Sequence, residues 1–110
     1  MVQRVGMVIG VRGDRLDEYR TLHADDHPGV RDLLAGANIR NFSIFLERLP
    51  DGELYLFGYY EYQGDDYEGD MARLDAIPRN REWLEMTGPM QIPLPGKAGW
   101  KVMEQVYHNA

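Results

Sequence analysis

The sequence predicts an α+β domain with the order strand, helix, strand, strand, helix, strand, in which helices cover one face of a four-stranded antiparallel sheet. Runs with strand and helix patterns follow one another in that order along the 110 residues. The first and third strands are apolar on both faces, and a soluble monomer does not leave a large apolar sheet exposed. We therefore expect a single ferredoxin-like domain spanning 1–110, paired into a dimeric α+β barrel.

The first strand and helix follow from apolar spacing. Residues 5–11 are apolar without alternation, which is typical of a strand covered on both faces. Asp14 is the expected N-cap of a helix. Pro28 lacks an amide hydrogen and disfavours helical geometry at the preceding residue, so the helix should kink or restart there. Gly36 and Asn38 are expected to end the helical segment. The apolar face of this segment carries Leu16, Leu22, Val30, Leu33 and Leu34.

A hairpin, two helices and a last strand complete the prediction. Residues 39–46 and 53–62 alternate as strands and flank the turn Pro50-Asp51-Gly52. Residues 67–77 should form a helix after a capping loop at 63–66, and Pro78 should separate it from a shorter helix that carries Trp83. Prolines and glycines argue against regular structure between residues 88 and 96. Residues 100–107 are the expected final strand.

The composition excludes several classes of function. The net charge is −6 and the twelve Lys and Arg residues are scattered, so we expect no nucleic-acid partner. The absence of cysteine excludes disulfides, thiolate nucleophiles and cysteine zinc sites. The apolar run at 5–11 is too short for a signal peptide or a membrane span. We therefore expect a soluble cytoplasmic protein without a membrane partner.

The first helix places polar side chains where a structural helix would carry leucine. Tyr19, His23 and His27 are spaced four residues apart, which stacks them on one helix face. A single histidine in such a position is more often a hydrogen-bonded structural residue than a catalyst, and Tyr19 alone would be a core aromatic. His23, His27 and Asp26 could form part of a metal site, but a closed zinc site needs further ligands, so we expect no metal.

These residues also belong to a longer pattern. Glu18-Tyr19, His23, Pro28, Leu34 and the strand at 41–46 follow one another at characteristic intervals. In this pattern the chain resembles the L-rhamnose mutarotase family, small enzymes that interconvert the α and β anomers of a free sugar. The resemblance implies a dimeric α+β barrel that needs no cofactor or metal. It also implies that His23 is the proton donor and that Tyr19 and Trp83 bind the sugar.

Several positions depart from the family pattern. Phe42 stands where the family has a sugar-contacting tyrosine, Glu82 replaces one tryptophan of a pair, and His27 occupies a position that is often tryptophan. Such changes alter which sugar hydroxyls find a hydrogen-bond partner. We expect a monosaccharide substrate of the 6-deoxyhexose type, either L-rhamnose or L-fucose. His27 and Glu61 are further candidates for substrate binding.

Two other functions fit the same fold. Dimeric α+β barrels include cofactor-free and haem-linked monooxygenases, in which His23 would be an axial ligand or would line an apolar pocket. A non-catalytic sugar-binding module would keep Trp83 but would need no titrating histidine. A His23→Asn variant separates these functions, because only the mutarotase should lose anomer exchange while it still binds the sugar.

Overall fold

The structure, a computed structural model, describes residues 2–110 and confirms the α+β prediction. The sheet strands are β1 (Gln3–Val11), β2 (Ile39–Arg48), β3 (Leu54–Tyr62), β4 (Gln91–Ile92) and β5 (Lys101–Met103). The helices are α1 (Leu16–Leu22), α2 (Arg31–Gly36), α3 (Tyr67–Ala76) and α4 (Pro78–Thr87), with short 3₁₀ turns η1 (Gly13–Arg15) and η2 (Gly88–Met90).

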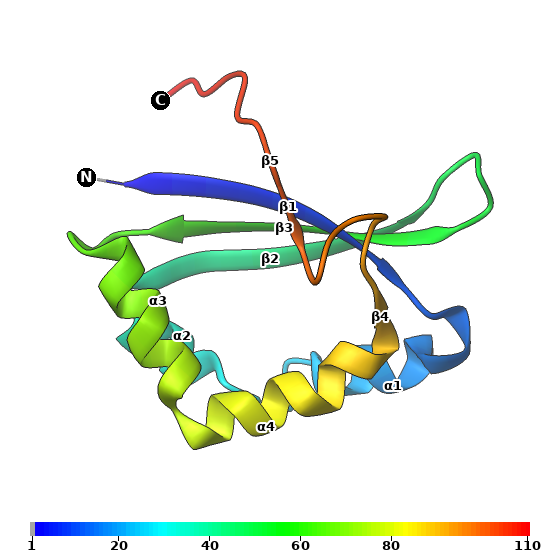
Figure 1. Ribbon diagram of the computed structural model, residues 1–110, viewed down its shortest axis with the longest axis horizontal. Coiled ribbons are helices and arrows are strands. Elements are labelled where there is room, and N and C mark those ends of the chain that lie inside the picture. The colour runs from blue at the N-terminus through cyan, green and yellow to red at the C-terminus, as the bar shows by residue number, and fades with distance from the viewer. Residues whose placement is uncertain (1) are drawn as a thin grey trace.

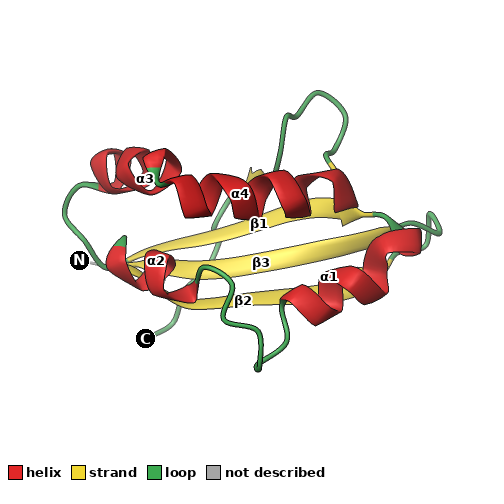
Figure 2. Ribbon diagram, turned by 90° about the horizontal axis from the view of Figure 1, so that it is seen from below, coloured by secondary structure: helices red, strands yellow, loops and turns green. Residues whose placement is uncertain are grey.

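The strands form one antiparallel sheet in the order β2-β3-β1-β4, and β5 also pairs with β1. β1 runs beside β3 along most of its length, with Val5 opposite Tyr60 and Ile9 opposite Leu56. Its other edge is shared by β4 and β5. The four helices lie against the same face of the sheet, and the opposite face is open (Figures 1 and 2).

The helix-covered face contains two groups of buried residues, which we name after the nearest helices. The α3 core consists of Val5, Ala37, Ile39, Tyr60, Tyr62 and Leu74. The α1 core consists of Ile9, Val11, Tyr19, Leu56 and Met90. Alternation along β1 and β3 supplies residues to both cores, because every second side chain points to the helix-covered face.

The first helix is shorter than expected, and its predicted cap is wrong. α1 begins after Arg15 and ends at Leu22. Asp14 does not cap it, because its carboxylate pairs with the Arg12 guanidinium at 2.7 Å. The chain then passes through turns until α2 begins. Gly29 in this linker is left-handed with φ +53°, a conformation that a helix cannot contain.

Strand β2 contains an irregularity that its alternation does not predict. Its register with β3 shifts between Arg40 and Ser43, and Asn41 is left-handed with φ 54°. This geometry indicates a β-bulge, in which an extra residue is left unpaired. Phe42 nevertheless stacks on Tyr60 of the helix-covered face, with ring centroids 5.3 Å apart.

The C-terminal part of the chain differs most from the prediction. The segment expected to lack regular structure contains the two-residue strand β4, which pairs with Gly10 and Val11. The expected strand at 100–107 is reduced to β5. Residues 104–110 are exposed and leave the sheet on the side away from the helices (Figure 1).

Other local predictions are confirmed. Asn38 is left-handed with φ 66° and follows α2, as expected for a residue that ends a helix. Asp66 caps α3 by accepting a hydrogen bond from the amide of Gly69. In the part of the chain that the structure describes, no helix has the length and apolar character needed to cross a bilayer.

Candidate active site

His23 is held at the C-terminal end of α1. Its amide lies 3.2 Å from the carbonyl oxygens of both Tyr19 and Arg20, so it closes the last turn of the helix. The Arg31 guanidinium lies 3.2 Å from the carbonyl oxygen of His23 and 3.0 Å from that of Ala24. This side chain therefore supplies donors to carbonyls that the broken helix leaves without amide partners.

The ring of His23 is fixed in one tautomer. Nδ1 lies 2.8 Å from the carbonyl oxygen of Tyr19. A carbonyl oxygen can only accept a hydrogen bond, so Nδ1 must carry the proton. In the neutral ring the proton-accepting lone pair is then on Nε2, at the opposite side of the imidazole. His23 can therefore act as a general base through Nε2, and as a general acid after it is protonated.

Tyr19 and His23 stack as their spacing predicts. Their ring centroids are 4.1 Å apart, with an angle of 21° between the planes. Tyr19 is buried, with 4% of its surface exposed, and its hydroxyl accepts a hydrogen bond from Nε2 of Gln91 at 3.3 Å. Gln91 lies in β4, so the site joins α1 to a strand about seventy residues away in sequence.

Trp83 completes an aromatic group around His23. Its ring is 5.3 Å from the His23 ring in an edge-on arrangement and 6.0 Å from the His27 ring. Gly29 lies against the indole, where an added Cβ would approach the ring to 3.1 Å. The structure thus brings together four of the predicted site residues. We call this group the histidine cluster, which consists of Tyr19, His23, His27 and Trp83.

The side chain of His27 is incompletely paired. Its Nδ1 is buried and has no hydrogen-bond partner among residues 2–110. Because α1 ends before it is reached, His27 joins the cluster through the linker and not through the helix face on which its spacing had placed it. A buried ring nitrogen without a partner is uncommon in folded proteins and often marks a site that another group completes.

A cavity of about 240 Å³ adjoins His23 between α1 and the sheet. It is smaller than the roughly 300 to 1,000 Å³ typical of drug-sized ligands, as expected for a site that takes a small molecule. Most of its wall is aliphatic, and the polar groups come from one turn of α1. The lining residues are Leu16, Tyr19, Arg20, His23, Ile44, Leu46 and Leu56. Trp83 is not one of them.

Burial controls the acid–base properties of the two central residues. It lowers the pKa of His23, and electrostatic interaction with Arg31 acts in the same direction. The hydrogen bond to the Tyr19 carbonyl opposes this shift, because it favours the protonated ring. Burial raises the pKa of Tyr19, and the hydrogen bond from Gln91 opposes that rise. His23 is therefore neutral and Tyr19 is protonated near neutral pH.

The structure does not bring Glu61 to this cavity. In the register of the sheet, Glu61 lies opposite Arg4 of β1 and Arg40 of β2. Alternation along β3 places its side chain on the open face of the sheet. There its carboxylate accepts hydrogen bonds from the Tyr59 hydroxyl at 2.9 Å and the Asn41 amide at 3.2 Å. The hydrogen bond from Tyr59 is the main reason that the pKa of Glu61 is lowered.

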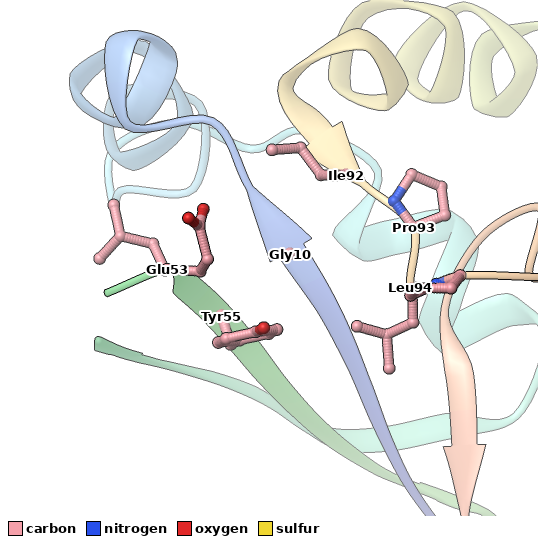
Figure 3. Close-up of a pocket in the computed structure, with 8 residues that line it drawn as sticks. Gly10, Glu53, Tyr55, Ile92, Pro93 and Leu94 are labelled. Carbon is pink, nitrogen blue, oxygen red and sulfur yellow. The ribbon is translucent and has the colours of Figure 1, made fainter. Parts of the chain in front are cut away.

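A second, smaller hollow lies where β1 and β3 meet the segment after β4 (Figure 3). Its volume is about 120 Å³, and the residues around it are Gly10, Glu53, Leu54, Tyr55, Ile92, Pro93, Leu94 and Pro95. None of the eight is a histidine, and the Tyr55 hydroxyl donates to Asp51 at 2.5 Å. Among residues 2–110, no group of three His, Asp or Glu side chains is arranged to hold a metal ion.

Sequence comparison identifies relatives of the chain. The family model for L-rhamnose mutarotase matches residues 4–109. An L-rhamnose mutarotase of Ligilactobacillus salivarius is 29% identical over 101 residues, covering 89% of this chain and 88% of that protein. The L-rhamnose mutarotase of Oceanobacillus iheyensis is 28% identical over 89 residues, covering 81% of this chain and 80% of that protein.

Solved structures share the fold. A crystal structure of an L-rhamnose mutarotase from Formosa agariphila superposes with a TM-score of 0.72 at 16% identity and covers 98% of this chain and 99% of its own. A Nitrosomonas europaea protein described as an antibiotic biosynthesis monooxygenase superposes with a TM-score of 0.55 at 10% identity, covering 99% and 94%. At these identities the structures show a common fold and not a common chemistry. The match of the family model over nearly the whole sequence is what decides the relationship: the chain belongs to the L-rhamnose mutarotase family.

Proposed function

We propose that this protein interconverts the α and β anomers of L-rhamnose and that His23 is its principal acid–base residue. One observation carries the assignment to His23: its tautomer is fixed by the Tyr19 carbonyl, which leaves the Nε2 lone pair available beside a cavity of small-molecule size. Family membership and the names of the relatives support the substrate.

The reaction requires only proton transfers. His23 Nε2 removes the proton from the anomeric hydroxyl, and the ring oxygen gains a proton as the C1–O5 bond breaks. The open-chain aldehyde turns about the C1–C2 bond, and the reverse transfers close the ring on the other face of the carbonyl. Both protons are returned, so no cofactor or metal is needed. Positioned acid–base groups contribute about 10² to 10⁴ to the rate of such a step.

The other members of the histidine cluster have supporting roles in this proposal. Tyr19 stacks on His23 and orients it or the sugar, and Trp83 supports the edge of the His23 ring. The aliphatic wall of the cavity suits the methyl group of a 6-deoxyhexose. His27 lies beside Trp83 and does not line the cavity, so it has no direct contact with the sugar in this proposal. Glu61 is left out of the proposed site, because it lies on the other face of the sheet.

We also propose that the protein acts as a homodimer in which the open sheet faces pack together. On that face Phe45 is 65% exposed, and at the C-terminal end Val106 and Tyr107 are 85% and 77% exposed. Large apolar side chains exposed in this way are typical of an interaction surface. Sedimentation analysis should give a dimer, and Phe45→Glu should give a monomer. A wild-type monomer at the concentrations used for assay would contradict the dimer.

Saturation-transfer NMR between the two anomers tests the activity directly. We expect the protein to accelerate exchange of L-rhamnose, and the rate with L-fucose measures how far Phe42 and Glu82 change the sugar preference. His23→Asn should lower the acceleration by about 10² to 10⁴ while the sugar still binds. The matched control is His108→Asn, which makes the same change at an exposed histidine and should leave exchange unchanged.

Three outcomes would count against the proposal. Equal exchange with and without the wild-type protein, for both sugars, would exclude a mutarotase. Sugar binding without acceleration would favour a non-catalytic binding module. Full acceleration by His23→Asn would leave the activity in place but remove His23 from the mechanism.

A further inference from the structure

Gln91 is a polar residue that family resemblance and sequence pattern both leave without a role. We propose that Gln91 is a positioning residue which fixes the direction of the Tyr19 hydroxyl proton, so that Tyr19 donates a hydrogen bond to the sugar in the cavity. Gln91 itself does not touch the reacting atoms in this proposal. The inference rests on the mutarotase activity proposed above.

The hydrogen bond between the two side chains sets this direction. Nε2 of Gln91 lies 3.3 Å from the Tyr19 hydroxyl oxygen. The amide nitrogen has protons but no acceptor lone pair, so Gln91 donates and the tyrosine oxygen accepts. The phenolic proton is then not used by Gln91. Within residues 2–110 no hydrogen bond from this hydroxyl to another protein group is present.

The position of Gln91 also bears on where the phenolic proton of Tyr19 points. Gln91 begins β4 and pairs with Val11, so its side chain shares the helix-covered face with Val11 and Ile9. It therefore reaches Tyr19 from the sheet, whereas the cavity is bounded by α1 and by β2 and β3. Tyr19 lines that cavity. We therefore assign the missing acceptor of the phenolic proton to a ligand in the cavity that Tyr19 lines.

The arrangement gives one turn of α1 two opposite hydrogen-bonding functions. His23 Nε2 is an acceptor because the Tyr19 carbonyl occupies Nδ1. The Tyr19 hydroxyl is a donor because Gln91 occupies one of its lone pairs. Ring opening needs both functions, since one proton leaves the anomeric hydroxyl and another is donated to the ring oxygen. The hydrogen bond from Gln91 also favours the phenolate, which makes Tyr19 a better donor.

Two substitutions at one position separate this role from simple packing. Gln91→Met keeps the length of the side chain but removes the donor. Gln91→Glu keeps its shape and replaces the donor by a carboxylate that can only accept, so the phenolic proton turns toward residue 91. We expect Gln91→Met to lower kcat roughly three- to tenfold with little change in KM. Gln91→Glu should lower kcat further, because it withdraws the proton from the sugar.

The same substitutions in a Tyr19→Phe background provide the control. Without the hydroxyl, neither Gln91→Met nor Gln91→Glu should reduce kcat any further. Equal losses with and without the Tyr19 hydroxyl would overturn the proposal, because they would show that Gln91 acts by packing. A Gln91→Glu variant more active than Gln91→Met would overturn the proposed direction of the proton.

A readout that does not depend on turnover keeps the two proposals distinguishable. NMR of ring-labelled tyrosine, with the Tyr19 signal identified by its loss in Tyr19→Phe, follows the ionisation of this phenol. Its pKa should rise in Gln91→Met and rise more in Gln91→Glu. An unchanged pKa in both variants overturns the hydrogen-bond inference even if exchange is catalysed. Absent exchange with a shifted pKa overturns the mutarotase proposal and leaves the contact established.

Discussion

Two tyrosines of similar burial, Tyr62 in the α3 core and Tyr19 in the α1 core, have very different hydrogen bonds. Tyr62 is 3% exposed, and its hydroxyl donates to Asp70 at 2.5 Å and accepts from the amide of Asp66 at 2.9 Å. Tyr19 is 4% exposed, and within residues 2–110 its hydroxyl has one hydrogen bond, which it accepts from Gln91. Among residues 2–110, the Tyr62 hydroxyl therefore has both an acceptor and a donor partner, whereas the Tyr19 hydroxyl has only a donor partner.

The same difference extends to the neighbours of each tyrosine. Around Tyr62, Asp70 also accepts from Asn38 at 3.1 Å and from Arg73 at 2.5 Å. In the histidine cluster, which contains Tyr19, the described residues leave His27 Nδ1 without a partner. Buried polar groups are nearly always paired in native proteins, so incomplete pairing in the histidine cluster is informative. We propose that the α3 core serves mainly to stabilise the fold and that the candidate site is built on the α1 core.

Truncation of Leu74 in the α3 core should produce the largest effect on stability. Leu74 is 8% exposed, and Leu74→Ala removes buried methyl groups and leaves a cavity. We expect a loss of about 2 to 5 kcal/mol in the free energy of unfolding, measured in urea. The kcat of the folded protein should not change. Leu84→Ala, at a 51% exposed position, is the matched control and should cost less than about 0.5 kcal/mol. A large fall in kcat for Leu74→Ala would show that the two cores are not separate in function.

A pair of glycines tests whether backbone contact with Trp83 matters for activity. Gly29 and Gly52 both have positive φ, at +53° and +85°, but only Gly29 lies against Trp83. Alanine at either position should cost about 1 to 2 kcal/mol of stability, because a Cβ is strained in this conformation. Gly29→Ala should in addition displace the indole and lower kcat/KM. If Gly52→Ala lowers kcat/KM equally, contact with Trp83 is not the cause.

Low pH should lower the free energy of unfolding by protonating Asp70 beside the α3 core. Hydrogen bonds from Tyr62, Arg73 and Asn38 lower the pKa of Asp70 to about 2. The unfolded carboxyl has a pKa of about 3.9 and so binds more protons than the folded one between these values. Its stabilising contribution is therefore present above about pH 4 and is lost as the pH falls toward 2. Urea unfolding from pH 5 to pH 2 should show a shallower decline for Asp70→Asn than for the wild type, and identical slopes would disprove this.

The smallest expected effect is a shift in the pH dependence of kcat/KM. In the proposed mechanism His23 acts in its neutral form and its pKa is lowered, so the acid limb of kcat/KM should lie below the ordinary histidine pKa of about 6.5. Arg31→Gln removes a positive charge that lowers the pKa of His23, so the acid limb should move to higher pH. Arg31→Lys keeps the charge and should leave the limb in place. A shift of the limb in Arg31→Lys as well would point to the lost contacts with the carbonyls of His23 and Ala24.

Much of the fold could be predicted because local rules determine it. The hairpin turn, the left-handed Asn38 and the Asp66 cap each depend on a few adjacent residues. Asp14 failed as a cap because a neighbouring arginine, Arg12, competes for its carboxylate. The strand β4 was missed because pairing with β1, and not its own sequence, makes two residues extended.

The site was predictable only where it lies within one helix. The spacing of Tyr19 and His23 correctly predicts their stacking, because residues four apart share a helix face. No sequence pattern indicates a role for Gln91 or Arg31, because tertiary packing determines their hydrogen-bond partners. Glu61 could have been excluded earlier: alternation along β3 already assigns it to the same face as Tyr59, opposite the helices.

The hydrogen bond between the His23 ring and the backbone of its own helix has a thermal consequence. His23 Nδ1 is bonded to a carbonyl in the last turn of a seven-residue helix, and so short a helix frays readily in water. Each time that turn opens, the imidazole is released and its tautomer is no longer fixed. Heating should therefore quench turnover before the sheet melts, and the gap between the two temperatures would report the local free energy of fraying.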